Sequence, residues 1–158
     1  ILVERPDYPC HAEGGTRRIA VRDNVFLRGW SDQVSLFGNE ATVSGNRIAS
    51  GKDMGITVHG RRNLVARNQV RHQGAAGIWV AVEESAVEDN TVVDSLWVNA
   101  QAKSLGDITL RRARDTVVAR NRCERRRTKG EGGLVLPEEA ARGGVRRARC
   151  EGWGGERR

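Results

Sequence analysis

Apolar residues recur at fixed distances from asparagine along most of this chain. The unit Val-x-x-Asn-x-apolar occurs at Val21/Asn24/Phe26, Val43/Asn46/Ile48, Val65/Asn68/Val70 and Val87/Asn90/Val92. Successive asparagines are 22 residues apart, and a fifth copy, Val118/Asn121/Cys123, follows 31 residues after Asn90. A fixed period of this length predicts a repeat architecture in which each unit packs only against its neighbours.

A second apolar unit lies between the asparagines and is often led by glycine. It occurs at Val34/Leu36, Ile56/Val58, Ile78/Val80, Ile108/Leu110 and Leu134/Leu136. Each period therefore predicts three short strands with inward apolar and outward polar residues, and parallel stacking favours a right-handed coil. We expect burial of Ile48, Ile56, Val65, Val70, Ile78 and Val87.

The asparagines are expected to hold the bend between two strands. An asparagine tolerates left-handed backbone geometry, and stacked asparagine side chains can hydrogen-bond along the axis of a solenoid. We therefore predict that Asn24, Asn46, Asn68, Asn90 and Asn121 form one line. Leucine-rich repeats are excluded because they need apolar residues five and eight positions before the asparagine. Those positions hold Ala41 and Gly38, Asn63 and Gly60, and Ser85 and Val82.

The repeat from Asn46 to Gly77, with its neighbours, resembles the right-handed parallel β-helix family. That family includes pectate-lyase-like and polygalacturonase-like enzymes, alginate epimerases, phage tailspikes and copper-maturation periplasmic proteins. The resemblance covers about residues 19–123 and implies an all-β solenoid. It also implies a lateral groove over the Gly-Ile-x-Val sheet, a polysaccharide or glycan partner, and an extracellular or periplasmic location.

The two ends depart from the repeat. Residues 1–18 are expected to hold part of an earlier coil, with Leu2 in its Gly-Ile-x-Val strand and a loop at about residues 7–16. An eight-residue insertion falls near Asp94–Lys103. Residues 124–158 are expected to be a degraded last coil and a disordered basic tail rich in Arg and Gly, although their composition also resembles out-of-frame translation of a GC-rich gene. The chain begins Ile-Leu-Val, which favours a processed form or an excised piece.

Candidate site residues gather around the outward positions of the Gly-Ile-x-Val sheet. An outward Trp79 is a natural platform for a sugar ring, although Trp97 in the insertion could instead cover it. Nearby charged residues could hold the carboxylates of an anionic glycan or could simply be solvated. The predicted substrate-binding set is Trp79, Thr57, His59, Arg61, Trp97, Asp107 and Arg111.

Catalytic chemistry is less well marked. Ser50, His72 and Asp94 are 22 residues apart and have the composition of a hydrolytic triad, but a polar corner ladder is the better interpretation. The chain lacks the Asp-Asp and Gly-His-Gly pairing of polygalacturonases, the Asp-Pro-His motif of the epimerases and a clustered set of Asp for calcium. If it is an enzyme, the resemblance implies a lyase or a glycoside hydrolase. No metal and no cofactor is predicted, because the cysteines show no CxxC spacing.

Composition narrows the choice of partner. The formal net charge is +7 and aromatics make up 4% of the chain. No apolar run is long enough to cross a membrane, no signal peptide is visible, and nucleic-acid binding is disfavoured because aromatics are not interleaved with the basic residues. The favoured function is polysaccharide binding or processing; the alternative is a non-catalytic structural or adhesin-like β-helix segment.

Overall fold

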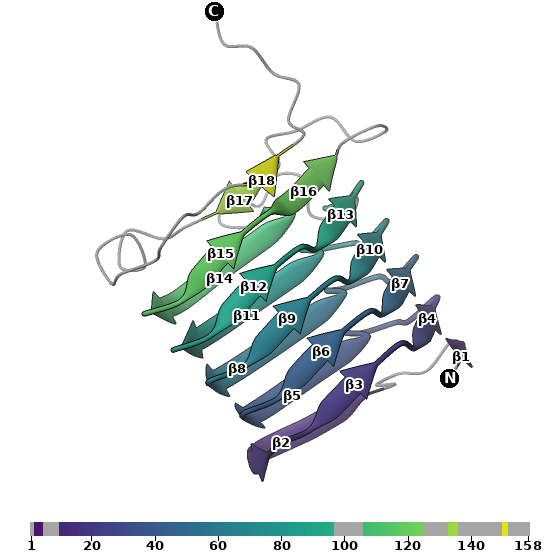
Figure 1. The fold of residues 1–158 in the computed structure, drawn as a ribbon. Helices are drawn as coiled ribbons and strands as arrows, with labels where there is room; N and C mark the ends of the chain where they lie inside the picture. Colours follow the sequence, from purple (N-terminus) through teal and green to yellow (C-terminus); the bar gives the residue numbers. More distant parts are fainter. Residues whose placement is uncertain (1, 5–9, 97–105, 125–132, 136–149, 152–158) are drawn as a thin grey trace, which may run out of the picture.

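The computed structural model describes residues 2–4, 10–96, 106–124, 133–135 and 150–151. Every regular element in these ranges is a β-strand, and all strand pairs are parallel. Figure 1 shows the coils stacked in sequence order, from the purple N-terminal end to the green and yellow C-terminal end. The predicted all-β parallel solenoid is confirmed.

Each coil contributes one strand to each of three sheets. Sheet A holds the strands that follow the asparagines: β1 (Leu2–Glu4), β4 (Val25–Leu27), β7 (Arg47–Ala49), β10 (Gln69–Arg71), β13 (Thr91–Val93), β16 (Asn121–Glu124) and β18 (Cys150–Glu151). Sheet B holds the Gly-Ile-x-Val strands: β2 (His11–Arg17), β5 (Val34–Asn39), β8 (Ile56–Arg61), β11 (Ile78–Glu83), β14 (Ile108–Arg114) and β17 (Leu134–Val135). Sheet C holds the strands before the asparagines: β3 (Ala20–Arg22), β6 (Thr42–Ser44), β9 (Leu64–Ala66), β12 (Ala86–Glu88) and β15 (Val117–Ala119).

The register follows the 22-residue period. Ile56 pairs with Ile78, Ile48 with Val70, and Val65 with Val87. All six of these side chains are buried, with at most 1% of their surface exposed, as the alternation predicts. The core is therefore a set of axial columns of Val, Ile and Leu, one column facing inward from each sheet.

The asparagines form a continuous hydrogen-bonded ladder. The Asn68 carbonyl Oδ1 accepts the backbone N–H and the side-chain amide of Asn46, each at 3.0 Å. The Asn68 amide in turn donates to Val43 O at 2.9 Å and to Asn90 Oδ1 at 3.0 Å. The same bonds link Asn24 to Asn46 and Asn90 to Asn121. The predicted line is confirmed.

The expected backbone conformation of the asparagines was wrong. The residue before each asparagine, and not the asparagine itself, adopts a positive φ: Asp23, Gly45, Arg67, Asp89 and Arg120. The reason is geometric, because the asparagine amide must face along the axis inside the coil, so the chain turns one residue earlier. The turning residue points outward, and its exposed position suits a charged side chain.

Oppositely charged side chains stack at the corner between sheets B and C. Arg18, Glu40, Arg62 and Glu84 occupy the same left-handed position in successive coils. Glu40 lies 3.2 Å from Arg18 and 3.1 Å from Arg62, and Arg62 lies 3.9 Å from Glu84. Hydrogen bonds from Arg18 and then Arg62 hold the pKa of Glu40 below its ordinary value. Exposed ion pairs of this kind contribute little singly, but this column favours one register because a slipped coil loses the alternation.

The first coil differs from the expected arrangement. Leu2 pairs with Val25 in sheet A, and the strand of sheet B is β2, in a segment expected to be mostly loop. Ala12 pairs with Leu36 and Thr16 with Gly38, so four steps along β2 oppose two along β5. The extra residues are accommodated as an irregularity within a strand.

The C-terminal irregularities fall partly within the described residues. On β14, Leu110 pairs with Val80 and Arg112 with Ala81, so Arg111 is the inserted residue of a bulge. β17 and β18 extend sheets B and A beyond the fifth asparagine. The predicted insertion beyond Leu96, the end of the predicted strand at Leu136, and most of the basic tail lie outside the described residues. Within the described part, no helix is long and apolar enough to span a membrane.

Candidate functional site

The outward column predicted on sheet B exists, but most of it is not accessible. Ser35, Thr57, Trp79, Thr109 and Val135 are register partners on successive strands. Ser35 and Thr57 are only 5% exposed, and Thr109 is fully buried. Trp79 is half-buried. Direct ligand contact through Thr57 is therefore not supported.

The connection from sheet A to sheet B explains this burial. The Thr57 hydroxyl donates to the sulfur of Met54 at 3.5 Å, and the Gly106 N–H donates to the Thr109 hydroxyl at 2.8 Å. Both partners lie three residues earlier, in the segment that leads into the strand. An outward side chain near the start of a sheet B strand is thus covered by its own connection, a contact that strand alternation does not reveal.

Three rings form an aromatic strip further along the strands. Phe37 and His59 are register partners on β5 and β8, and their ring centres lie 4.2 Å apart with planes 17° from parallel. The His59 ring centre lies 4.9 Å from that of Trp79 on β11, with a 45° tilt. All three side chains keep part of their surface exposed. Burial lowers the pKa of His59, which favours the neutral imidazole beside its two aromatic neighbours.

Two arginines from the predicted set lie at the surface of sheet B. Arg61 ends β8 and forms an ion pair with Glu83 at 2.8 Å, while its backbone N–H donates to Asn39 Oδ1 at 2.9 Å. Arg111 is exposed and occupies the bulge of β14. Both guanidinium groups are accessible to an anionic ligand, although Arg61 already has a carboxylate partner.

Asp107 has a structural position. It is completely buried, and its Oδ2 accepts the backbone N–H of Gly133 at 2.8 Å. Its carbonyl also accepts the Ile78 N–H, which ties two coils together. The expectation that Asp107 contacts substrate is not supported, because a fully buried carboxylate offers no surface to a ligand. Trp97, the remaining predicted residue, lies outside the described residues.

Ser50, His72 and Asp94 stack at the end of sheet A, as their spacing predicts. Each has a φ between 51° and 59°, and each backbone N–H donates to a carbonyl of the following coil. Ser50 and His72 are exposed, whereas Asp94 is buried. The shared position of these residues is that of a left-handed corner, which supports the ladder interpretation over a hydrolytic triad.

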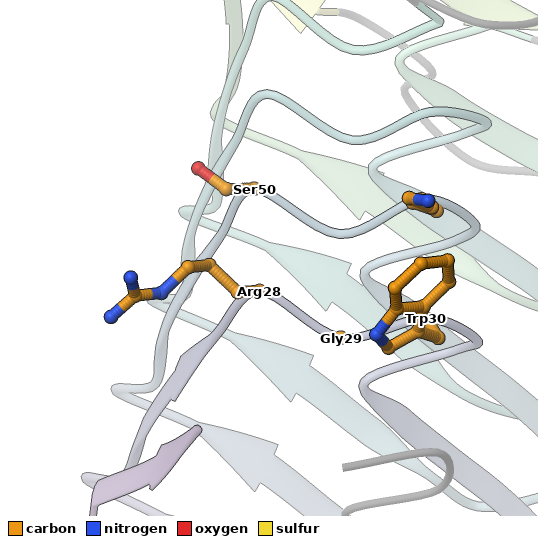
Figure 2. Close-up of a pocket in the computed structure, with 5 residues that line it drawn as sticks. Arg28, Gly29, Trp30 and Ser50 are labelled. Carbon is orange, nitrogen blue, oxygen red and sulfur yellow. The ribbon is translucent and has the colours of Figure 1, made fainter. Parts of the chain in front are cut away.

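A hollow that the sequence reasoning missed lies at the corner between sheets A and B. Its volume is about 410 Å³, and it is lined by Arg28, Gly29, Trp30, Ser50 and Lys52. Figure 2 shows Arg28 and Ser50 at one end of the connecting segments and Trp30 at the other. Trp30 is 59% exposed, and Lys52 Nζ lies 3.3 Å from the centre of its ring. The available signal was the 22-residue separation between Trp30 and Lys52, which places them in successive coils.

Metal chemistry finds no support in the described ranges. There, no group of three His, Cys, Asp or Glu side chains gathers closely enough to hold a metal ion. The chemistry that the described surface offers is therefore that of aromatic rings and charged side chains.

Comparison with known families identifies the fold. A family model described as a right-handed β-helix region matches residues 8–103, which is more than half of the chain. The chain belongs to the right-handed β-helix family. Comparisons with curated proteins and with solved structures gave no significant match. The right-handed β-helix supports many unrelated functions, so the function must be argued from the side chains of this chain.

Proposed function

We propose that this right-handed β-helix binds a glycan across sheet B, with the strip of Phe37, His59 and Trp79 as its platform. The observation that carries the proposal is the stacking of three partly exposed rings on adjacent strands. Aromatic faces bind the apolar C–H faces of sugar rings, and rings already fixed by their neighbours lose little entropy on binding.

The proposal is for binding and not for a reaction. The only acidic side chain named at the edge of the strip, Glu83, is paired with Arg61. A glycosidase needs two carboxyl groups flanking the bond to be cleaved, one of them protonated. Arg61 and Arg111 instead suit contacts with the polar or anionic groups of a bound chain.

A structural or adhesin-like role is the competing function. Its support is the regularity of the described coils, in which the asparagine ladder and the corner ion pairs account for many polar groups without any ligand. Under that role the aromatic strip is simply a covered patch of one sheet.

Glycan-array binding followed by titration of Trp79→Ala separates the two roles. We expect this substitution to weaken glycan binding by about 1–2 kcal/mol, which is the usual worth of an aromatic contact. Val117→Ala, which shortens an exposed apolar side chain on sheet C, is the control and should bind as the parent does. Unchanged affinity in a folded Trp79→Ala variant would refute the platform and favour the structural role.

A further inference from the structure

The hollow beside Trp30 combines an apolar wall with positive charge. Trp30 has the largest exposed fraction among the large apolar residues that the structure describes, and it lies in a hollow of about 410 Å³. That volume is within the range of small-ligand sites. An exposed tryptophan at the edge of a hollow, instead of in the core, offers a surface on which an apolar face can pack.

Lys52 gives this hollow its charge preference. Its ammonium group lies over the Trp30 ring, and its backbone N–H donates to Gly29 O at 2.9 Å, which fixes one coil against the next. Arg28 borders the hollow, with its side chain directed away from Trp30 (Figure 2). No acidic residue is among the lining residues. The local field therefore favours an anionic group next to Lys52.

The hollow and the aromatic strip belong to the same two coils. Trp30 precedes Phe37 by seven residues and Lys52 precedes His59 by seven residues. Seven residues span at most about 25 Å of backbone, so one short oligosaccharide can reach both places. The connection that carries Trp30 leads directly into β5, at the edge where the strands of sheet B begin.

We propose that the hollow binds the anionic group of a charged sugar unit, with Lys52 holding the carboxylate or sulfate and Trp30 packing against the sugar ring. The choice of a sugar rests on the proposed function of sheet B. The hollow gives that function a substrate class, an anionic glycan, through residues outside the aromatic strip.

The test compares three galactose-based hexasaccharides by isothermal titration: a neutral one, one carboxylated at C6, and one carrying sulfate esters. We expect the full chain to bind at least one charged probe about fivefold more tightly than the neutral probe at low salt. Lys52→Met should remove this preference while leaving the affinity for the neutral probe unchanged. Trp30→Ala should weaken binding of the charged probe, also by about fivefold. Arg22→Met removes one positive charge from an exposed position of sheet C and should leave the preference intact.

The outcomes separate the two proposals. If Lys52→Met loses the preference and Trp79→Ala weakens all three probes, both hold, and the charged probe that loses more affinity identifies carboxylate or sulfate as the anion. If Lys52→Met has its effect and Trp79→Ala has none, the hollow is a site and the platform on sheet B is wrong. If no charged probe is preferred, or if Lys52→Met behaves like Arg22→Met, the anionic site is refuted.

Discussion

The asparagine ladder predicts a large and position-dependent cost of removing one amide. Asn68 lies in the middle of the ladder, is 1% exposed, and makes four side-chain hydrogen bonds to three residues. Asn68→Ala leaves the Asn46 backbone N–H and the Val43 carbonyl without these partners in the interior. Each buried polar group that loses its partner costs about 1–3 kcal/mol, so the substitution should destabilise the fold by about 2–6 kcal/mol.

Asn24→Ala is the matched control at the end of the ladder. Asn24 is half-buried, and its amide donates one long bond of 3.3 Å to Asn46. Its backbone N–H would keep its partner, Asn46 Oδ1, at 3.0 Å. We therefore expect a loss of only about 0.5–1.5 kcal/mol, the typical net worth of a single hydrogen bond.

Urea unfolding followed by far-ultraviolet circular dichroism measures both variants. The free energies of unfolding should differ by more than about 1 kcal/mol, and amide hydrogen exchange should be fastest at Asn46 in the Asn68→Ala variant. Equal losses in the two variants would show that the ladder hydrogen bonds do not stabilise the solenoid.

Two further predictions concern the core and the corner. Ile78 is fully buried between register partners on β8 and β14, so Ile78→Ala should cost about 2–4 kcal/mol in urea unfolding, against under about 0.5 kcal/mol for the exposed Val117→Ala; a loss as small as that of the control would reverse the inward–outward assignment. The lowered pKa of Glu40 means that its contribution to stability is present above the ordinary glutamate pKa of about 4.3 and is lost as the pH falls through the lower folded value. Glu40→Gln should therefore lower the unfolding midpoint at neutral pH and match the parent at about pH 3 and in high salt, and a difference that persists under those conditions would exclude the ion pairs as its cause.

The sequence alone determined the coil and its register, because side chains in a solenoid contact residues one period away. The 22-residue spacing of Asn46, Asn68 and Asn90 specified both the ladder and the three strands around it. The extra residue between Ile108 and Asn121 likewise indicated the irregularity that the structure places at Arg111. The same spacing also contained the alternating charges of Glu40 and Arg62, which only needed to be compared at that offset.

Only the tertiary structure decided which outward side chains are accessible. Alternation places Thr57 and Trp79 equivalently, yet Met54 covers Thr57, while Trp79 leans toward His59 of the neighbouring strand. The buried position of Asp107 and the exposed position of Trp30 also depend on how the connections between sheets A and B fold. These connections have no strand periodicity, so their side-chain contacts are set by packing between neighbouring coils and not by a pattern along one coil.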